Sequence, residues 1–144
     1  MIRKYNADDI AELLDVWYDA SQMAHPFLTR GFLDQERRNV IQKYLPIAAT
    51  WVFEEEEEEG RVVGFIALMG NEVGGIFVAP GRHGQGIGRA LMDRARACRN
   101  HLDVEVFEAN EIGRAFYDAY GFEVVGAGVH EETGEPVLRL RLDC

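Results

Sequence analysis

The stretch GRHGQGIGRALM, residues 81–92, decides how the rest of the chain is interpreted. Glycine occupies every second position from Gly84 to Gly88, directly before a run that predicts a helix starting near Ile87. Glycine gives up side-chain packing and loses more backbone entropy than other residues, so this repeat indicates a special demand on the main chain. An apolar strand ending at Pro80 precedes the loop, which makes the local order strand, loop, helix.

A strand–loop–helix junction of this kind suits an anion. The first N–H groups of a helix have no intrahelical acceptor, and the helix dipole adds about half a positive charge at that end. Arg82, His83 and Arg89 lie beside the predicted helix start. The alternative is a glycine-rich turn that only permits tight packing. The residues of this stretch alone leave both interpretations open.

Two better-known phosphate-binding motifs do not fit. The dinucleotide fingerprint G-x-G-x-x-G needs a third glycine where Arg89 stands, and it should follow the first strand of a βαβ unit. A P-loop needs Gly-Lys followed by Ser or Thr, and the chain contains no Gly-Lys pair.

Composition predicts one globular domain spanning residues 1–144, because 47% of the residues are hydrophobic and the length suits a single core. No apolar run approaches the roughly 20 residues that cross a bilayer, and the opening MIRKYNADDI has no apolar signal segment. The two cysteines, Cys98 and Cys144, form neither a disulfide framework nor a metal-binding spacing. We therefore expect a cytoplasmic protein without a metal and without a membrane partner.

The formal net charge of -10 argues against a nucleic-acid partner, because such proteins usually present a basic face. Acidity either serves solubility or attracts cationic substrates such as amines. A phosphate site in this chain must then be built locally, from backbone amides and a few cations.

Hydrophobic periodicity predicts a mixed α/β layer structure. The expected strands cover residues 2–5, 50–53, 62–69, 73–79, 104–107, 123–129 and 137–142. The first two expected helices cover residues 10 to about 24 and 34–44, and Asp8 or Asp9 is expected to cap the first. Two more helices are expected to start near Ile87 and at Asn110. On the last two helices, the apolar faces are expected to carry Ile87, Leu91, Ala95 and Cys98, and Ile112, Phe116 and Ala119, respectively.

Breaks between these elements also have local signals. Six consecutive glutamates, residues 54–59, predict a solvated turn closed by Gly60. The pair Gly74-Gly75 predicts a β-bulge or a close backbone approach. Gly121 is expected to end its helix in the left-handed conformation, with Phe122 folding back onto that helix.

Two motifs together carry a family resemblance. Pro80-x-x-His83-Gly84-x-Gly86-x-Gly88 resembles the acetyl-CoA signature of the GCN5-related N-acetyltransferases, the GNAT family. The stretch NEIGRAFYDAYGF, residues 110–122, resembles the family's second motif, Asn…Phe-Tyr…Gly-Phe. Their order and spacing are similar to the family's, as is the order of elements along the whole chain.

This resemblance implies a fold: a mixed, mostly antiparallel sheet of about six to seven strands, flanked by about four helices, with a splayed central parallel strand pair. It also implies acetyl-CoA as acetyl donor, with the pantetheine arm along residues 76–78 and the pyrophosphate at residues 83–89. A free N–H at the bulge would then bond the thioester carbonyl. The implied cofactor-binding residues are Phe77, Val78, Arg82, His83, Gly84, Gln85, Gly86, Ile87, Gly88, Arg89, Asn110 and Tyr117.

One residue departs from the family pattern. His83 stands where relatives commonly carry Arg or Gln. Because backbone amides would hold most of the pyrophosphate, we expect binding to survive, with lower affinity or with pH sensitivity.

The resemblance also implies catalytic roles, each with a simpler alternative. Tyr117 matches the tyrosine that donates a proton to the leaving sulfur, and the alternative is a core aromatic residue. Glu72 matches a position where relatives often carry the base, acting directly or through water, and the alternative is an exposed strand-end carboxylate. Asn110 is expected to bond the pantetheine arm, or only to cap its helix.

The acceptor side is less defined by sequence. His25 lies in the segment that lines the acceptor site in this fold, where it would bind substrate or shuttle protons, and the alternative is a structural histidine. Phe27 would wall the acceptor pocket with Trp51, or both would belong to the core.

The resulting hypothesis is an N-acetyltransferase in which a primary amine of a small molecule or peptide attacks acetyl-CoA directly. Neither cysteine is near the motifs, which disfavours a covalent enzyme intermediate. The alternative is a CoA-binding or acyl-CoA-binding sensor or partner protein without turnover. A homodimer is compatible with the family, because late strands in this fold often pair between subunits.

Overall fold

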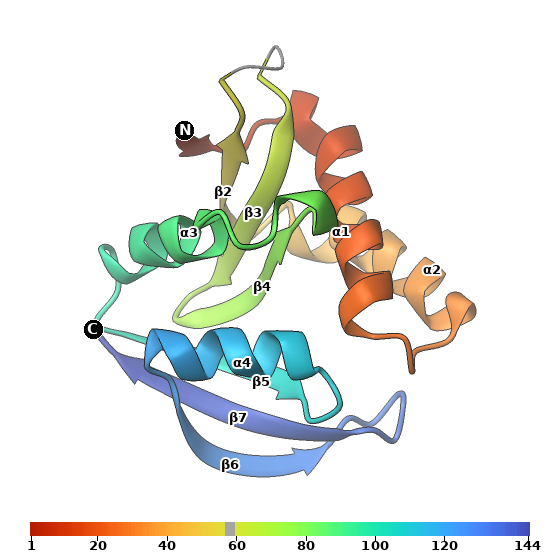
Figure 1. The fold of residues 1–144 in the computed structure, drawn as a ribbon. Helices are drawn as coiled ribbons and strands as arrows, with labels where there is room; N and C mark the ends of the chain where they lie inside the picture. Colours follow the sequence, from red (N-terminus) through yellow and green to blue (C-terminus); the bar gives the residue numbers. More distant parts are fainter. Residues whose placement is uncertain (57–59) are drawn as a thin grey trace.

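The computed structural model describes residues 1–56 and 60–144, which form one seven-stranded sheet covered by helices on both faces (Figure 1). The strand order is β1-β2-β3-β4-β5-β7-β6. The strands are β1 (Ile2–Lys4), β2 (Ala49–Glu54), β3 (Val62–Met69), β4 (Glu72–Val78), β5 (His101–Phe107), β6 (Glu123–Val129) and β7 (Pro136–Asp143). The helices are α1 (Ile10–Ala24), α2 (Arg30–Asn39), α3 (Ile87–Arg96) and α4 (Glu111–Tyr120), with short helical turns at Ala7–Asp9, Val40–Tyr44 and Pro80–Arg82.

The sheet is antiparallel except at β4 and β5, which run parallel and meet only through Glu72 and Asp103. Beyond that pair the two strands diverge, as Figure 1 shows between β4 and β5. The predicted fold class, with its splayed central parallel pair, is confirmed.

The predicted bulge is at Gly74. Ala67 of β3 faces Gly75, whereas its neighbour Leu68 faces Val73, so Gly74 is the extra residue on β4. An extra residue bends its strand and increases the local twist. The bulge therefore lies next to the point where β4 leaves β5.

Two apolar cores cover opposite faces of β2–β4. On one face Leu13 and Trp17 of α1 pack with Val52 and Phe65. The core on the opposite face lies under α3 and is larger, because it also includes the apolar residues between α4 and strands β5–β7. Its members include Ile66, Leu91, Met92, Leu102, Tyr117, Phe122 and Leu140. Figure 1 shows α1 and α3 on opposite sides of β3, with α4 lying over β5 and β7.

Several predicted boundaries are wrong, for local reasons. The helix expected at residues 34–44 begins at Arg30, because the Thr29 hydroxyl accepts the Phe32 N–H at 3.1 Å, and it ends in a π-helical turn, Val40–Tyr44. Asp9, one of the two predicted caps, occupies the N-cap position of α1, but its side chain forms no capping hydrogen bond to that helix. Asn6 caps the preceding short turn instead, and the Asp9 carboxylate accepts the Asn6 N–H, which makes a capping box.

The expected apolar faces of α3 and α4 need correction as well. Ile87, Leu91 and Ala95 are buried, but Cys98 lies beyond the end of α3 and is exposed. On α4, Ile112 and Ala119 are exposed at the rim of a cleft, and Tyr117 is the deeply buried residue.

Of the remaining signals, the predicted helix end at Gly121 and the core position of Trp51 are confirmed. Gly121 has φ 118° and ends α4, while Phe122 is buried against the Tyr117 ring. Trp51 belongs to the core. The solvated turn predicted from Glu54 onwards is wrong at its start, because Glu54 is the last residue of β2 and the carboxylates of Glu54 and Glu55 pair with Arg3 and Arg82. Residues 57–59 of that prediction lie outside the described part of the chain. Of the helices that the structure describes, none has the length and apolar character needed to cross a membrane.

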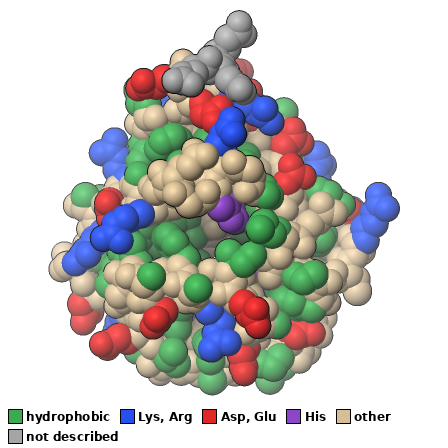
Figure 2. Space-filling view, viewed as in Figure 1, with side chains coloured by type: hydrophobic (Ala, Val, Ile, Leu, Met, Phe, Trp, Pro, Cys, Tyr) green, Lys and Arg blue, Asp and Glu red, His purple; other side chains and the backbone are tan. Residues whose placement is uncertain are grey.

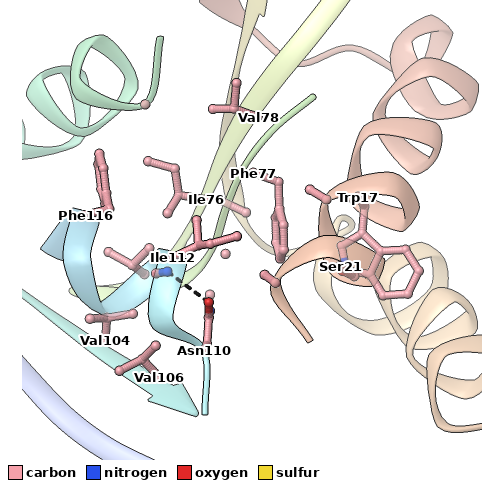
Figure 3. Close-up of a pocket in the computed structure, with 18 of the residues that line it drawn as sticks. Trp17, Ser21, Ile76, Phe77, Val78, Val104, Val106, Asn110, Ile112 and Phe116 are labelled. Carbon is pink, nitrogen blue, oxygen red and sulfur yellow. Dashed lines mark hydrogen bonds between the residues drawn. The ribbon is translucent and has the colours of Figure 1, made fainter. Parts of the chain in front are cut away.

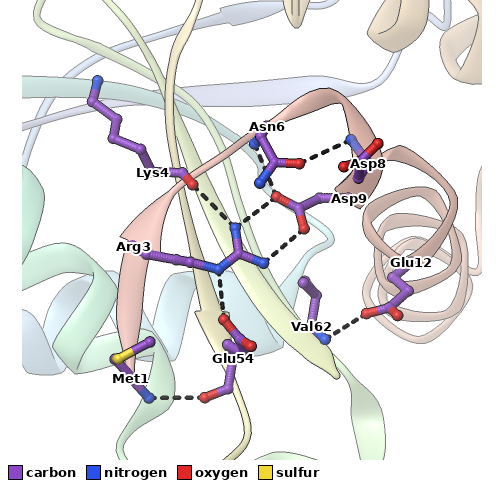
Figure 4. A network of polar contacts seen from close by, with 9 residues as sticks. All are labelled: Met1, Arg3, Lys4, Asn6, Asp8, Asp9, Glu12, Glu54 and Val62. Atoms are coloured by element: carbon purple, nitrogen blue, oxygen red, sulfur yellow. Dashed lines mark hydrogen bonds and ion pairs between the residues drawn. The ribbon is translucent and has the colours of Figure 1, made fainter. Parts of the chain in front are cut away.

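A polar network ties the first strand to α1 and β2 (Figure 4). The Arg3 guanidinium donates to both Asp9 oxygens at 2.8 Å and, through Nε, to Glu54 at 2.5 Å. Asp9 is only 6% exposed, and the hydrogen bonds from Arg3 lower the pKa of its carboxyl. Farther along α1, Glu12 accepts the Val62 N–H of β3 at 2.6 Å. These contacts fix the start of α1, the helix that forms one wall of the cleft described below.

Replacing Arg3 by methionine should lower the free energy of unfolding at pH 7 by about 2–4 kcal/mol, because the buried Asp9 carboxylate would lose its partner. The loss should shrink as the pH falls and should vanish below the lowered pKa that Asp9 has in the wild type, because a protonated carboxyl no longer gains from the Arg3 charge. Urea denaturation at several pH values measures both effects. Arg141→Met is the control, because Arg141 pairs with Asp103 on the exposed surface and should cost less than about 1 kcal/mol. Equal losses for the two variants would contradict the importance of the Arg3 network.

Candidate active site

A cleft of about 780 Å³ opens where β4 leaves β5. Its walls come from α1 and α2 on one side and from α3, α4 and β5 on the other. Figure 2 shows this face of the molecule hollowed at its centre, with hydrophobic side chains around the hollow. The divergence of two strands thus produces a cavity large enough for a small-molecule ligand.

The glycine loop forms one end of the cleft, and its glycines serve two different purposes. Gly84 and Gly86 both have φ 79°, and a Cβ atom on either would meet no other atom within 4 Å. Gly88 is helical, and a Cβ atom there would lie 3.1 Å from the Phe116 ring of α4. Left-handed turns therefore require the first two glycines, and helix packing requires the third. The packing interpretation is therefore confirmed at Gly88, while the conformations of Gly84 and Gly86 leave the main chain of the loop accessible to a ligand.

The start of α3 retains the features of an anion site. Gly86 occupies the N-cap position, and no side chain caps the first turn. The loop at Gly84 and Gly86 is open to the outside, so a ligand can approach the main chain closely.

The cationic side chains near this loop have partners of their own. Arg82 pairs with Glu55, which lowers the pKa of that carboxyl, and the His83 Nε2 lies 3.0 Å from the Val78 carbonyl oxygen. Arg89 lies over the Tyr120 ring, with 5.6 Å between the guanidinium carbon and the ring centre. Arg82, His83 and Arg89 all line the same end of the cleft, beside Gly84 and Gly86.

The edge of β4 that faces β5 has no strand partner beyond Glu72 among the described residues. Successive side chains of β4 point into opposite halves of the cleft, as Figure 3 shows for Ile76 and Phe77. Phe77 points towards Trp17 and Ser21 of α1, and Ile76 points towards α4. An extended ligand can therefore add to this edge through main-chain hydrogen bonds.

Asn110 and His25 meet at the base of α4. The Asn110 Oδ1 accepts the Gly113 N–H at 2.9 Å, and its Nδ2 lies 3.1 Å from His25 Nε2. Since an amide nitrogen only donates, His25 Nε2 accepts and the ring proton resides on Nδ1. The ring lies edge-on to Phe27 and Phe107, with centres 5.7 and 5.2 Å away. Burial lowers the pKa of His25 to about 4, so the ring is neutral at pH 7.

Tyr117 lines the cleft and is only 7% exposed. Its hydroxyl has no hydrogen-bond partner within residues 1–56 and 60–144, in contrast to the Tyr120 hydroxyl, which donates to Asp93 at 2.5 Å. Burial raises the pKa of Tyr117, so its hydroxyl keeps the proton at neutral pH. Because Tyr117 lines the cleft, its hydroxyl can form a hydrogen bond with a ligand there.

Carboxylates lie in the cleft away from the glycine loop. Glu72 and Glu105 line it near Arg139, and Glu36 lines it from α2, together with Met23 and Tyr44 among other residues. Both oxygens of Glu72 accept hydrogen bonds from Arg139, at 2.8 and 2.9 Å, and a Glu105 oxygen lies 3.8 Å from the same guanidinium. A proton or a ligand N–H at Glu72 must therefore use the lone pairs that Arg139 leaves free.

The structure brings most of the predicted site residues to one cleft. Those that line it are His25, Glu72, Phe77, Val78, Arg82, His83, Gly84, Gly86, Ile87, Gly88, Arg89, Asn110 and Tyr117. Two do not line it: Gln85 lies in the loop outside, and Phe27 packs behind His25 on Phe107.

Sequence reasoning did not identify the acidic residues Glu36 and Glu105, or Arg139. Arg139 reaches Glu72 only because β7 pairs with β5, which runs beside the start of β4. No local signal reveals a pairing between strands so far apart in sequence. Glu105 had a weak signal, as a charged residue within an otherwise apolar strand.

Comparison with known proteins shows what this chain resembles. A family model described as an acetyltransferase (GNAT) domain matches residues 46–124. The chain is 33% identical to the peptidyl-lysine N-acetyltransferase YiaC of Escherichia coli, over 94% of this chain and 92% of that protein. It is 30% identical to the peptidyl-lysine N-acetyltransferase YjaB of the same organism, over 98% and 94% of the two chains.

Solved structures agree with these sequence relationships. The solution structure of apo YjaB from Escherichia coli superposes with a TM-score of 0.84, 29% identity and coverage of 98% of this chain and 95% of that one. The PaiA N-acetyltransferase of Thermoplasma acidophilum, crystallised with coenzyme A, has a TM-score of 0.79 at 16% identity, with 96% of each chain covered. At that identity the likeness to PaiA is one of fold.

The neutral state of His25 predicts a pH dependence of stability. Its pKa is lowered in the folded protein to about 4, against about 6.5 when unfolded, so the unfolded chain binds more protons between these values. His25 should therefore contribute a loss of roughly 3 kcal/mol in unfolding free energy as the pH falls from about 6.5 to about 4. The difference between wild type and His25→Gln in urea denaturation isolates this contribution. Parallel pH profiles for the two proteins would show that His25 is not held neutral.

Proposed function

The chain belongs to the acetyltransferase (GNAT) family, and from that premise we propose that it acetylates the side-chain amine of lysine in proteins or peptides. It is an N-acetyltransferase, and the family uses acetyl-CoA as donor. Both curated relatives described above are peptidyl-lysine N-acetyltransferases, which supports lysine as the acceptor here. The observation that carries the proposal is the polarity of the cleft, which is cationic at the glycine loop and carries carboxylates away from that loop.

The donor half of the cleft fits coenzyme A by its chemistry. The uncapped start of α3 and the open loop at Gly84 and Gly86 suit a pyrophosphate, which the main chain would hold. Arg82 and Arg89 would supply positive charge, with Arg82 shared between the ligand and Glu55. The open edge of β4 at Phe77 and Val78 suits the amides of a pantetheine arm.

The acceptor half suits a lysine side chain. Its amine arrives as a cation on a long apolar stem, and the lining offers carboxylates together with Met23 and Tyr44. Glu36 and Glu105 would attract the ammonium group, and the exposed rim leaves room for a peptide backbone outside. The protein's net charge of -10 adds a long-range attraction for basic segments of a target.

The transfer itself needs a base and an acid. Glu72 would take a proton from the ammonium group, directly or through water, which frees the nitrogen lone pair to attack the acyl carbon. The carbon–sulfur bond breaks as the new carbon–nitrogen bond forms, and Tyr117 would give its hydroxyl proton to the departing sulfur. The raised pKa of Tyr117 suits that role, because the acid must still hold its proton at neutral pH.

We also propose that the chain works as one domain and in the cytoplasm. Residues 1–144 would work as one domain, because the sheet runs from β1 near the start to β7 near the end. Cys98 and Cys144 are both free and exposed, which favours a reducing compartment such as the cytoplasm.

An acceptor panel tests the proposal. With acetyl-CoA, a peptide that is blocked at its N-terminus and contains one lysine should gain 42 Da by mass, about the mass of one acetyl group replacing a proton. The same peptide with arginine in place of lysine should remain unmodified. Glu36→Gln and Glu105→Gln should each raise KM for the peptide by about 3- to 10-fold, as expected for partly screened charges. Glu123→Gln, on β6 away from the cleft lining, is the matched control.

Three outcomes would contradict parts of this function. Acetylation of small amines or peptide N-termini, but never of lysine, would overturn the acceptor. Binding of acetyl-CoA without turnover on any amine would favour a sensor over an enzyme. Equal KM values for all three glutamate variants would contradict the proposal that Glu36 and Glu105 attract the lysine ammonium group.

The role of Tyr117 has a separate test. Tyr117→Phe should lower kcat by about 100-fold or more, while KM for acetyl-CoA changes by less than about threefold. Thermal stability should be unchanged or slightly higher, because the hydroxyl has no hydrogen-bond partner among the residues that the structure describes. Tyr18→Phe, outside the cleft lining, controls for the loss of a phenol elsewhere. A Tyr117→Phe enzyme with wild-type kcat would exclude Tyr117 as the acid.

A further inference from the structure

We propose that His25 is a positioning residue: its Nε2 accepts a hydrogen bond from the Asn110 amide and thereby holds the two halves of the split sheet in register across the cleft. The hydrogen bond itself does not depend on the proposed function. Only the activity test does, because it measures the rate of the proposed lysine acetylation. It assigns His25 a different role from the substrate contact or proton shuttle that sequence alone suggested.

The direction of this hydrogen bond is determined by a third residue. The Asn110 Oδ1 accepts the Gly113 N–H at 2.9 Å, and this bond caps the first turn of α4. Rotating the amide by half a turn would replace that acceptor with a donor and break the cap. The Asn110 Nδ2 therefore faces His25 Nε2, and it can bond only to an imidazole nitrogen that carries no proton.

The surroundings of the ring keep it in this state. Phe27 and Phe107 lie against His25 edge-on, and His130 follows on the other side of Phe107, with 5.2 Å between those two ring centres. His25 forms no ion pair with any residue of the described ranges, whereas His101 lies 3.4 Å from Asp103. With no carboxylate to favour a charged ring, burial holds the ring neutral.

The position of the bond explains why it matters. Strand pairing joins β4 and β5 only at Glu72 and Asp103, so hydrogen bonds of the sheet do not align the two halves beyond that point. His25 directly follows α1, which packs on β3 and β4, and Asn110 follows β5 and starts α4. Their bond spans 85 positions of sequence and crosses from one half to the other.

Tyr117 depends on this connection. It lies seven residues after Asn110, two turns along α4 and on nearly the same face of that helix. A shift or rotation at the start of α4 therefore carries through to the Tyr117 hydroxyl. Misplacement of a reacting group by about 1 Å can lower a rate about 100-fold.

The role also removes His25 from proton transfer. Its Nε2 lone pair is engaged by Asn110, and its Nδ1 carries the proton, so neither nitrogen is free to accept one. A positioning role and a base role consequently predict different behaviour for the same substitutions.

Three substitutions of His25 separate the possible roles. Glutamine places an acceptor oxygen near the position of Nε2, asparagine places one near Nδ1, and phenylalanine keeps the ring shape without an acceptor. For a positioning role, kcat of His25→Gln should stay within about threefold of wild type. His25→Asn and His25→Phe should lose about 10- to 100-fold, with the pH profile of kcat unchanged in shape.

Other orders of activity would overturn the proposal. If His25 shuttled protons, glutamine would lose as much activity as phenylalanine, and a limb of the pH profile would disappear. If the ring only filled space, phenylalanine would be the most active variant and glutamine among the least. Circular dichroism and thermal melts on each variant show which proteins are folded and can enter the comparison.

A measurement on the unsubstituted protein is independent of both folding and activity of variants. Nitrogen-15 NMR of the histidine rings at pH 7 should show His25 as the neutral tautomer with the proton on Nδ1. A proton on Nε2, or a charged ring, would overturn the hydrogen bond and the proposal with it. If the protein acetylated no lysine, the proposed function would fail, while this NMR result would still decide the hydrogen bond.

Discussion

The incomplete pairing of β4 with β5 is the constraint on which the rest of the molecule depends. A parallel sheet would normally continue its ladder along both strands, but here it stops at Glu72 and Asp103. The bulge at Gly74 bends β4 away, which leaves a strand edge unpaired and opens the cleft beside it. Every proposed site residue lies on an element that borders this opening or packs against one that does.

The opening removes strand-pairing hydrogen bonds between β4 and β5, and contacts between side chains connect the surrounding elements instead. The Arg3 network fixes α1 against β1 and β2 on one side. Across the cleft, the His25–Asn110 bond and the ring contacts of Phe107 connect the end of α1 to α4 and β5. These contacts connect the two halves of the sheet beyond the point where strand pairing ends.

The distribution of charge follows the same division. Burial keeps the side chains in the middle of the cleft neutral: the pKa of His25 is lowered and that of Tyr117 is raised. Formal charges are at the two ends, with arginines beside the glycine loop and carboxylates around Arg139. Neutral side chains between charged ends suit the proposed transfer of an uncharged acyl group between an anionic donor and a cationic acceptor.

Sequence by itself determined the order of the elements and the family, and it supplied most of the residues that we propose for the donor side, because these depend on signals within short stretches. The glycine repeat from Gly84 to Gly88 indicated a special demand on the main chain, Gly74-Gly75 indicated the bulge, and the motif at residues 110–122 indicated the family and the helix that carries Tyr117. Tertiary structure alone decided the acceptor side. Arg139 meets Glu72 through the pairing of β7 with β5, and His25 meets Asn110 from 85 residues away. Such contacts depend on how distant elements pack, and periodicity or spacing within one segment carries no information about them.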